Sequence, residues 1–307
     1  MFCSCDNQFV EKGDSFIKHV DPFIGTSGHG HTYPGAAVPF GMLQISPDNG
    51  ISGWDWSSGY HYSDSITIGF SHLHLSGTGI GDLGDIRFMP VNKKFNLVNT
   101  VKTRDDISYK STYSHDEESA DAGYYSVFLE NHQIKAELTS SLRTAFHRYT
   151  FTKNDMQSVI VDLGYAFNWD NTELSQLKKV DKFTISGFRY SKGWAKNQKV
   201  FFVAKFSKSI KEFDLVSDEK YINENHVTGI KTSAQLYFND LNEEKLEVKL
   251  GLSSVSVKNA STKNIYIQSA TLNGEELNRT FITHNELMNE GILHFVMGEN
   301  PNKSWGI

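Results

Sequence analysis

Histidine, tryptophan and aspartate side chains gather in one glycine-rich stretch of the sequence, from Val20 to Pro90. Five of the twelve histidines of the chain lie there, together with two of its five tryptophans. Glycine permits positive φ angles and close approach of backbones, so this composition predicts shaped loops rather than regular strands or helices. Loops on a rigid scaffold commonly carry binding and catalytic residues. The candidate site residues are therefore His29, His31, Trp54, Asp55, Trp56, His72, His74, Asp82 and Asp85.

The histidines form two pairs, His29 with His31 and His72 with His74. Residues i and i+2 of a strand face the same side, so each pair could present two imidazoles together. With the two aspartates of residues 81–85, these pairs could bind zinc or another transition metal. The spacing is not that of a helical zinc hydrolase motif. We favour an interpretation without a metal, in which the histidines bond to loop backbone or contact a sugar.

The aromatic residues of the stretch favour a carbohydrate. Trp54, Asp55 and Trp56 are consecutive, and Tyr60 and Tyr62 follow shortly after. A sugar ring has apolar C–H faces and a rim of hydroxyls, and leaving a buried hydroxyl unpaired costs about 1–3 kcal/mol. It therefore needs an aromatic platform with polar partners at its edge. Trp54 or Trp56 could be that platform, and one of them could instead be a core plug beneath it.

Residues 76–85, SGTGIGDLGD, contain the pattern Gly-x-Gly-x-x-Gly. A nucleotide-binding loop of this kind runs from a parallel strand into a helix. Here the strand-like IRFMP follows, so we reject the nucleotide interpretation. Asp82 and Asp85 are predicted to accept hydrogen bonds from sugar hydroxyls or to brace the loop. Glycoside hydrolysis needs two carboxyl groups across a pocket, and spacing does not select a pair among Asp48, Asp55, Asp64, Asp82 and Asp85.

Composition excludes several other classes of protein. The 307 residues carry a net charge of −6, and lysine and arginine form no basic stripe, which argues against nucleic acid. No run approaches the roughly 18 apolar residues of a membrane helix. The two cysteines, Cys3 and Cys5, have no distant partner for a disulfide. The N-terminus resembles the end of a bacterial lipoprotein signal, with Cys3 or Cys5 lipidated, or else is a disordered start with incidental thiols.

After residue 123 the sequence is dominated by short segments rich in Val, Ile, Phe, Tyr and Thr, many of them partly alternating. This pattern predicts an all-β fold, an antiparallel β-sandwich. One helix is predicted over 283–291, with Thr283 as N-cap and Glu286 completing a capping box. The predicted strands cover residues 124–130, 134–142, 144–152, 158–164, 182–191, 199–207, 233–239, 245–257, 264–272 and 292–297.

Three segments of the sequence resemble the N-terminal β-sandwich domain of glycoside hydrolase family 92. They are GHTYPGAAVPFGMLQISPD (30–48), GYHYSDSITIGFSHLHLSGTGIGDLGDIRFMP (59–90) and, more weakly, residues 122–151. The family's enzymes are α-mannosidases that invert configuration on α-mannosides such as those of N-glycans. The resemblance implies a galactose-mutarotase-like supersandwich, α-mannoside glycans as partners, and a periplasmic or cell-surface location.

The tail of the sequence, residues 264–306, is similar to the C-terminal strands of the same family. In the family a large helical domain lies between these parts and carries the Ca²⁺ site, the general acid and the general base. Here the two parts meet at Ala260 to Lys263. We therefore expect an N-terminal lead (1–19), a sandwich domain (20–260) and C-terminal strands packing on the same sandwich (261–307).

This departure limits which activity we expect. Losing a general acid or base removes about 10²–10⁴-fold of rate per group. The prediction is a shortened α-mannosidase homologue that keeps one wall of the mannose pocket and has little activity of its own. The alternatives are a non-catalytic mannoside-binding module and a hydrolase with a new carboxylate pair, such as Asp82 with Asp55.

Overall fold

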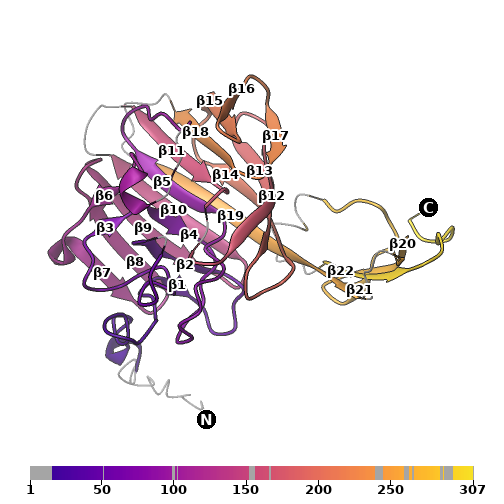
Figure 1. The fold of residues 1–307 in the computed structure, drawn as a ribbon, viewed down its shortest axis with the longest axis horizontal. Coiled ribbons are helices and arrows are strands. Elements are labelled where there is room, and N and C mark those ends of the chain that lie inside the picture. Colours follow the sequence, from indigo (N-terminus) through magenta and orange to yellow (C-terminus); the bar gives the residue numbers. More distant parts are fainter. Residues whose placement is uncertain are drawn as a thin grey trace, which may run out of the picture.

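Antiparallel strands build nearly all of the part of the chain that the structure describes (Figure 1). The structure is a computed structural model, and it describes residues 16–50, 52–98, 101, 103–151, 156–165, 167–238, 245–258, 263–264, 266–283, 286 and 293–306. The helical segments whose first and last residues the structure describes are short 3₁₀ turns: η1 (Phe16–His19), η2 (Arg104–Asp106) and η3 (His115–Glu117). The all-β prediction is confirmed.

Two large sheets make up the sandwich, and a small pair, β3 (Ile66–Thr67) with β6 (Ser111–Thr112), lies beside them. The eight-stranded sheet has the order β1-β2-β4-β5-β11-β18-β15-β16. Its strands are β1 (Ala36–Ala37), β2 (Gln44–Asp48), β4 (Gly69–Ser71), β5 (Arg87–Val91), β11 (Gln157–Asp162), β18 (Thr232–Phe238), β15 (Ile210–Ser217) and β16 (Lys220–Ile222).

The twelve-stranded sheet has the main order β17-β12-β13-β14-β19-β10-β9-β8-β7, and three C-terminal strands extend it from β19. Its main strands are β17 (His226–Gly229), β12 (Asn171–Lys179), β13 (Thr184–Lys192), β14 (Gln198–Phe206), β19 (Lys245–Lys258), β10 (Thr144–Phe151), β9 (Ile134–Ser140), β8 (Tyr124–Leu129) and β7 (Glu118–Asp121). The extension consists of β20 (Tyr266–Leu272), β21 (Glu275–Glu276) and β22 (Leu293–Gly298).

The core forms because each sheet turns one apolar face inward. Along β10 every second residue is buried, which is the alternation expected of a strand with one face in the core. Aromatic rings join the two sheets: Phe88 of β5 stacks on Phe206 of β14 at 6.4 Å, and Phe206 contacts Phe238 of β18 at 5.1 Å. This rigid scaffold positions the loops that carry the candidate site.

Those loops converge at one end of the sandwich. In the eight-stranded sheet, β4 ends at Ser71, β5 begins at Arg87 and β11 ends at Asp162, and the antiparallel pairing of these strands places all three strand ends at this end. The twelve-stranded sheet reaches the same place, since Arg189 of β13 forms an ion pair with Asp85, just before β5. Loops from both sheets can therefore build one site.

The structure departs from the predicted elements in two ways. Residues 20–90 are not loops alone, because β2 and β4 lie in this stretch and are almost wholly buried. The segment IRFMP, predicted to be strand-like, does form a strand, β5. Several strands were not predicted, among them β7, β12, β15, β16 and β17. In β12 (NTELSQLKK) only Ser175 and Leu177 are buried, so its polar outer face hides the strand pattern.

The C-terminal strands continue the sheet along the long strand β19, and Figure 1 shows them projecting away from the sandwich. β22 runs parallel to the end of β19 and antiparallel to β20. The predicted capping box is present, since the Thr283 amide donates to Glu286 and the Glu286 amide donates to the Thr283 hydroxyl. Cys3, Cys5, most of the predicted helix and most of the expected join at Ala260 to Lys263 lie outside the described residues. No helix of the described chain has the length and apolarity needed to cross a membrane.

Candidate functional site

His29, His31 and Asp55 form a compact group of polar side chains, here called the histidine–aspartate cluster. Nδ1 of His29 lies 2.7 Å from Oδ1 of Asp55, and Nε2 of His31 lies 3.7 Å from the same oxygen. The ring of Trp54 contacts both imidazoles, with centroids 5.0 Å from His29 and 4.2 Å from His31. The Trp54 side chain is 54% exposed, so its ring forms part of the surface beside the cluster.

The electrostatics of the cluster keep Asp55 ionised. Its hydrogen bond with His29 lowers the pKa of this carboxyl below its ordinary value, and the neighbouring histidines add to the effect. At neutral pH a negative charge therefore lies next to the exposed ring of Trp54. A carboxylate accepts hydrogen bonds readily, so Asp55 is suited to bind hydroxyl groups of a ligand that rests on the tryptophan.

Two backbone features hold this arrangement. His31 has a φ of 53°, a conformation that residues other than glycine rarely adopt. Gly79 also has a positive φ, and a Cβ at this position would lie 2.8 Å from Nε1 of Trp54 and 2.9 Å from Nδ1 of His31. Only glycine allows the 76–85 loop to pack against these two rings.

Trp56 takes a different role from its neighbour. Its ring packs against the backbone at Gly53, and its Nε1 donates a hydrogen bond of 3.0 Å to Asp64. The same carboxylate pairs with Arg104. The half-buried Trp56 therefore fills space beneath the loop, while Trp54 faces outward.

Two further tryptophans, which the sequence reasoning missed, lie on loops tied to this site. Trp169 is 50% exposed and Trp194 is 66% exposed. The amide of Gly53 donates to the side chain of Asn168 at 2.8 Å, which joins the Trp54 loop to the Trp169 loop. The amide of Ala195 donates to Asp82 at 2.7 Å, which joins the Trp194 loop to residues 76–85. The sequence indicates these two exposed tryptophans only weakly: each stands beside Asn, Asp or Gly in a segment between two strands.

The second histidine pair does not join the cluster. His72 is fully buried and shares a hydrogen bond of 2.9 Å with His147 of the opposite sheet, and burial lowers the pKa of His72 to about 3. His74 is buried against Asp48 at 2.9 Å and Ser71 at 2.9 Å. The chain leaves strand geometry after Ser71, so the two imidazoles face different partners. In this structure both lie in the interior.

Asp82 and Asp85 are also buried. Asp85 pairs with Arg189 at 2.6 Å, and Asp170 pairs with the same guanidinium at 2.6 Å. Burial raises the pKa of Asp170 to about 6, against the opposing effect of Arg189. Gln198 of β14 donates to Asp85 as well. These contacts fasten residues 76–85 to the twelve-stranded sheet, which is the bracing role, and they place both carboxylates below the surface.

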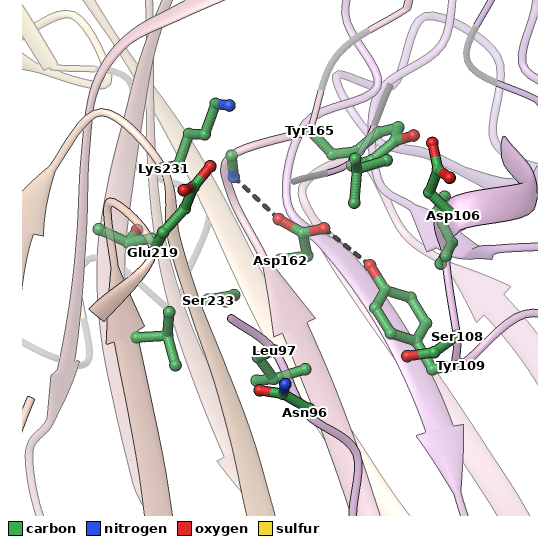
Figure 2. A pocket seen from close by; sticks show the side chains of 15 residues that line it. Asn96, Leu97, Asp106, Ser108, Tyr109, Asp162, Tyr165, Glu219, Lys231 and Ser233 are labelled. Atoms are coloured by element: carbon green, nitrogen blue, oxygen red, sulfur yellow. Dashed lines mark hydrogen bonds between the residues drawn. The ribbon is translucent and has the colours of Figure 1, made fainter. Parts of the chain in front are cut away.

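A separate cavity of about 110 Å³, lined by both polar and apolar residues, opens between the end of β11 and the start of β18 (Figure 2). Asp162 lies in its wall, where it accepts hydrogen bonds from the Tyr109 hydroxyl at 2.8 Å and the Gly164 amide at 2.9 Å. The guanidinium of Arg87 lies 3.8 Å over the ring of Tyr165 and pairs with Asp162. Sequence reasoning did not single out this cavity, because its residues come from distant segments.

The fold and site together define a β-sandwich whose loop surface, aromatic and anionic, suits a carbohydrate. The chain belongs to glycosyl hydrolase family 92: the family's N-terminal domain matches residues 19–253, and its catalytic domain matches residues 230–299. This confirms the resemblance seen in the sequence.

Solved structures of the same family are similar to this chain. A family GH92 α-mannosidase of Bacteroides thetaiotaomicron, solved in complex with mannoimidazole, is 37% identical with a TM-score of 0.74, covering 79% of this chain and 33% of that one. A GH92 inverting mannosidase of the same organism is 27% identical with a TM-score of 0.64, covering 78% and 31%. An uncharacterized secreted glycosidase of Arthroderma benhamiae is 31% identical over 155 residues, 48% of this chain and 20% of that protein. The chain thus spans a third or less of these relatives.

The family resemblance implies Ca²⁺, and the residues of the cluster do not fit that ion. Calcium takes 6–8 oxygen ligands. Among the described residues, His29, His31 and Asp55 form a group whose potential ligand atoms all lie within 4.8 Å of one another. Two of these three atoms are imidazole nitrogens. The histidine–aspartate cluster therefore does not suit calcium.

Proposed function

We propose that the loop surface around Trp54 binds α-mannosides as one wall of a mannose site. The observation that carries this proposal is the exposed Trp54 ring, held by two imidazoles and flanked by the ionised Asp55. A mannose ring stacked on Trp54 would place its hydroxyls near Asp55 and His29. The family membership and the mannoimidazole complex of a relative support the choice of mannose over other sugars.

The neighbouring loops supply a longer platform. Trp169 and Trp194 are exposed on segments bonded to the Trp54 and Asp82 loops. Sugar units beyond the first could rest on these rings. On this proposal His72, His74, Asp82 and Asp85 support the surface from beneath, since all four are buried.

We do not assign hydrolysis to this surface. Inversion needs two carboxyl groups about 6.5–9.5 Å apart on opposite sides of the sugar. In residues 20–90 the described carboxylates other than Asp55 and Asp21 are buried and engaged: Asp48, Asp64, Asp82 and Asp85. Asp55 alone provides one group near Trp54. The function we propose is therefore recognition, and the general acid and base of the family would have to come from residues outside this surface.

The test is calorimetric titration with methyl α-mannoside and α-1,2-mannobiose at millimolar concentrations. We expect weak binding that Trp54→Ala lowers by about tenfold or more, because aromatic anchors commonly contribute about 2 kcal/mol. Phe281→Ala is the matched control, since this exposed aromatic ring lies between β21 and β22 in the sequence and not on the site loops. No binding by the unaltered chain, or equal losses in the two variants, would refute the proposal.

Two finer expectations accompany this function. A secreted relative supports an extracytoplasmic location, and we propose lipidation at Cys3 or Cys5 as the anchor. Metabolic labelling with a palmitate analogue tests it, with Cys3→Ser and Cys5→Ser identifying the modified residue.

A further inference from the structure

The histidine–aspartate cluster contains an imidazole nitrogen that has no partner. His31 is only 7% exposed, and its Nε2 is a buried atom without a hydrogen bond. A buried polar atom left unpaired costs about 1–3 kcal/mol, so native proteins rarely leave one without a reason. This nitrogen points toward Asp55, whose Oδ1 lies 3.7 Å away, too far for a hydrogen bond.

The other two donors complete a three-sided site. His29 Nδ1 lies 2.7 Å from Oδ1 of Asp55, and one ligand atom from each of the three residues falls within 4.8 Å of the others. Zinc bonds of about 2.0–2.1 Å in tetrahedral geometry separate ligand atoms by about 3.3 Å. The two distances to Asp55 lie on either side of this value, so small side-chain movements suffice to bind an ion.

The imidazole of His31 cannot easily turn away from this position. Trp54 packs against it edge to face at 4.2 Å, and the backbone of Gly79 packs closely against both rings. The strained backbone of His31, with φ 53°, adds a cost that the fold sustains at this residue. Such fixed orientation is what a metal ligand needs.

We propose that the histidine–aspartate cluster binds a divalent transition-metal ion, zinc fitting best, through His29 Nδ1, His31 Nε2 and Asp55 Oδ1. Two imidazoles and one carboxylate suit zinc, cobalt or nickel and do not suit calcium. Three protein ligands leave a coordination position open. It faces solvent, because the His29 side chain is 72% exposed, so water or a hydroxyl of a ligand can reach the ion. The proposal does not depend on mannoside binding.

The test is calorimetry of the full chain, without a histidine tag, against zinc chloride at pH 7.5. A Cys3→Ser/Cys5→Ser background removes the thiols, which would bind zinc themselves. We expect one ion per chain, no comparable binding of Ca²⁺, and visible absorption bands when Co²⁺ replaces zinc. His29→Ala and Asp55→Asn should each weaken zinc binding at least about tenfold.

The control is His226→Ala. His226, the first residue of β17, is exposed, and its Nδ1 lies 3.9 Å from the carboxylate of Glu224, so this variant also removes a histidine–carboxylate pair. It should leave zinc binding unchanged. Because His31 is buried, the melting curve of His31→Ala is recorded without metal to show whether the variant folds. His29→Ala changes an exposed side chain and is expected to leave the fold intact. Absent zinc binding, or binding that survives His29→Ala and Asp55→Asn, would overturn the proposal. Titration without sugar separates this result from the mannoside test.

Discussion

Replacing Arg189 with methionine should lower the free energy of unfolding by about 3–5 kcal/mol, the usual effect of removing one partner of a buried ion pair. The guanidinium is completely buried and pairs with both Asp85 and Asp170. Its Nε also donates to the Thr172 hydroxyl at 3.0 Å and to the Leu163 carbonyl at 3.2 Å. Methionine keeps much of the volume, so the loss comes from two buried carboxylates without a cation. Urea denaturation at pH 7.5 measures it, and the melting temperature should fall by roughly 5–15 °C.

The control is Arg148→Met, in which an arginine–carboxylate pair is broken at the surface. Arg148 and Glu247 are 3.2 Å apart, and their side chains are 41% and 40% exposed. Exposed pairs contribute about 0–1 kcal/mol, so little change is expected. Adding Asp85→Asn and Asp170→Asn to Arg189→Met should restore part of the stability by removing the unpaired charges. Equal losses for Arg189→Met and Arg148→Met would show that the buried network does not hold these loops.

The strands that could be predicted from sequence are those with a clear pattern of their own. In β10 (TAFHRYTF) core-facing and outward-facing residues alternate, and this period-two pattern predicts a strand with one buried face. β12 has a polar outer face, and its strand identity comes from pairing with β13 and β17. β2 and β4 are only five and three residues long and contain Pro and Gly respectively, which are poor strand formers. Tertiary pairing and burial decide such segments.

The candidate site divides in the same way. The spacing of His29 and His31 predicted that a strand would present both on one face. The structure places them in a loop, where His31 has a positive φ, and still brings both to Asp55. The spacing of His72 and His74 is identical, yet their partners come from other elements and draw both rings inward. Contacts such as Asp85 with Arg189, 104 residues apart, or Gly53 with Asn168, 115 apart, leave no local pattern in a single sequence. The same holds for the exposed Trp169 and Trp194.

Lowering the pH from 7.5 to 5.5 should destabilise the protein through His72 and His147, by about 2–3 kcal/mol for the pair. Burial lowers the pKa of His72 to about 3, and burial and then His72 lower the pKa of His147 well below its ordinary value of 6.5. When the pH falls below 6.5, the unfolded chain takes up protons that the folded core refuses. Stability from these groups is therefore full above pH 6.5 and is lost as the pH falls. Urea denaturation at several pH values measures the slope.

The double variant His72→Gln/His147→Gln isolates this effect, because glutamine can replace some of the hydrogen bonds and does not titrate. It should be less stable at pH 7.5 and should lose much less further stability by pH 5.5. Other groups with shifted pKa values are the same in both proteins. Burial lowers the pKa of His132, which adds to the loss. Burial raises the pKa of Asp85 and raises the pKa of Asp170 to about 6, so these two carboxyls stabilise the fold as they take up protons. The difference between the two pH profiles cancels these contributions, so parallel profiles would mean that the buried histidine pair is not neutral in the folded state.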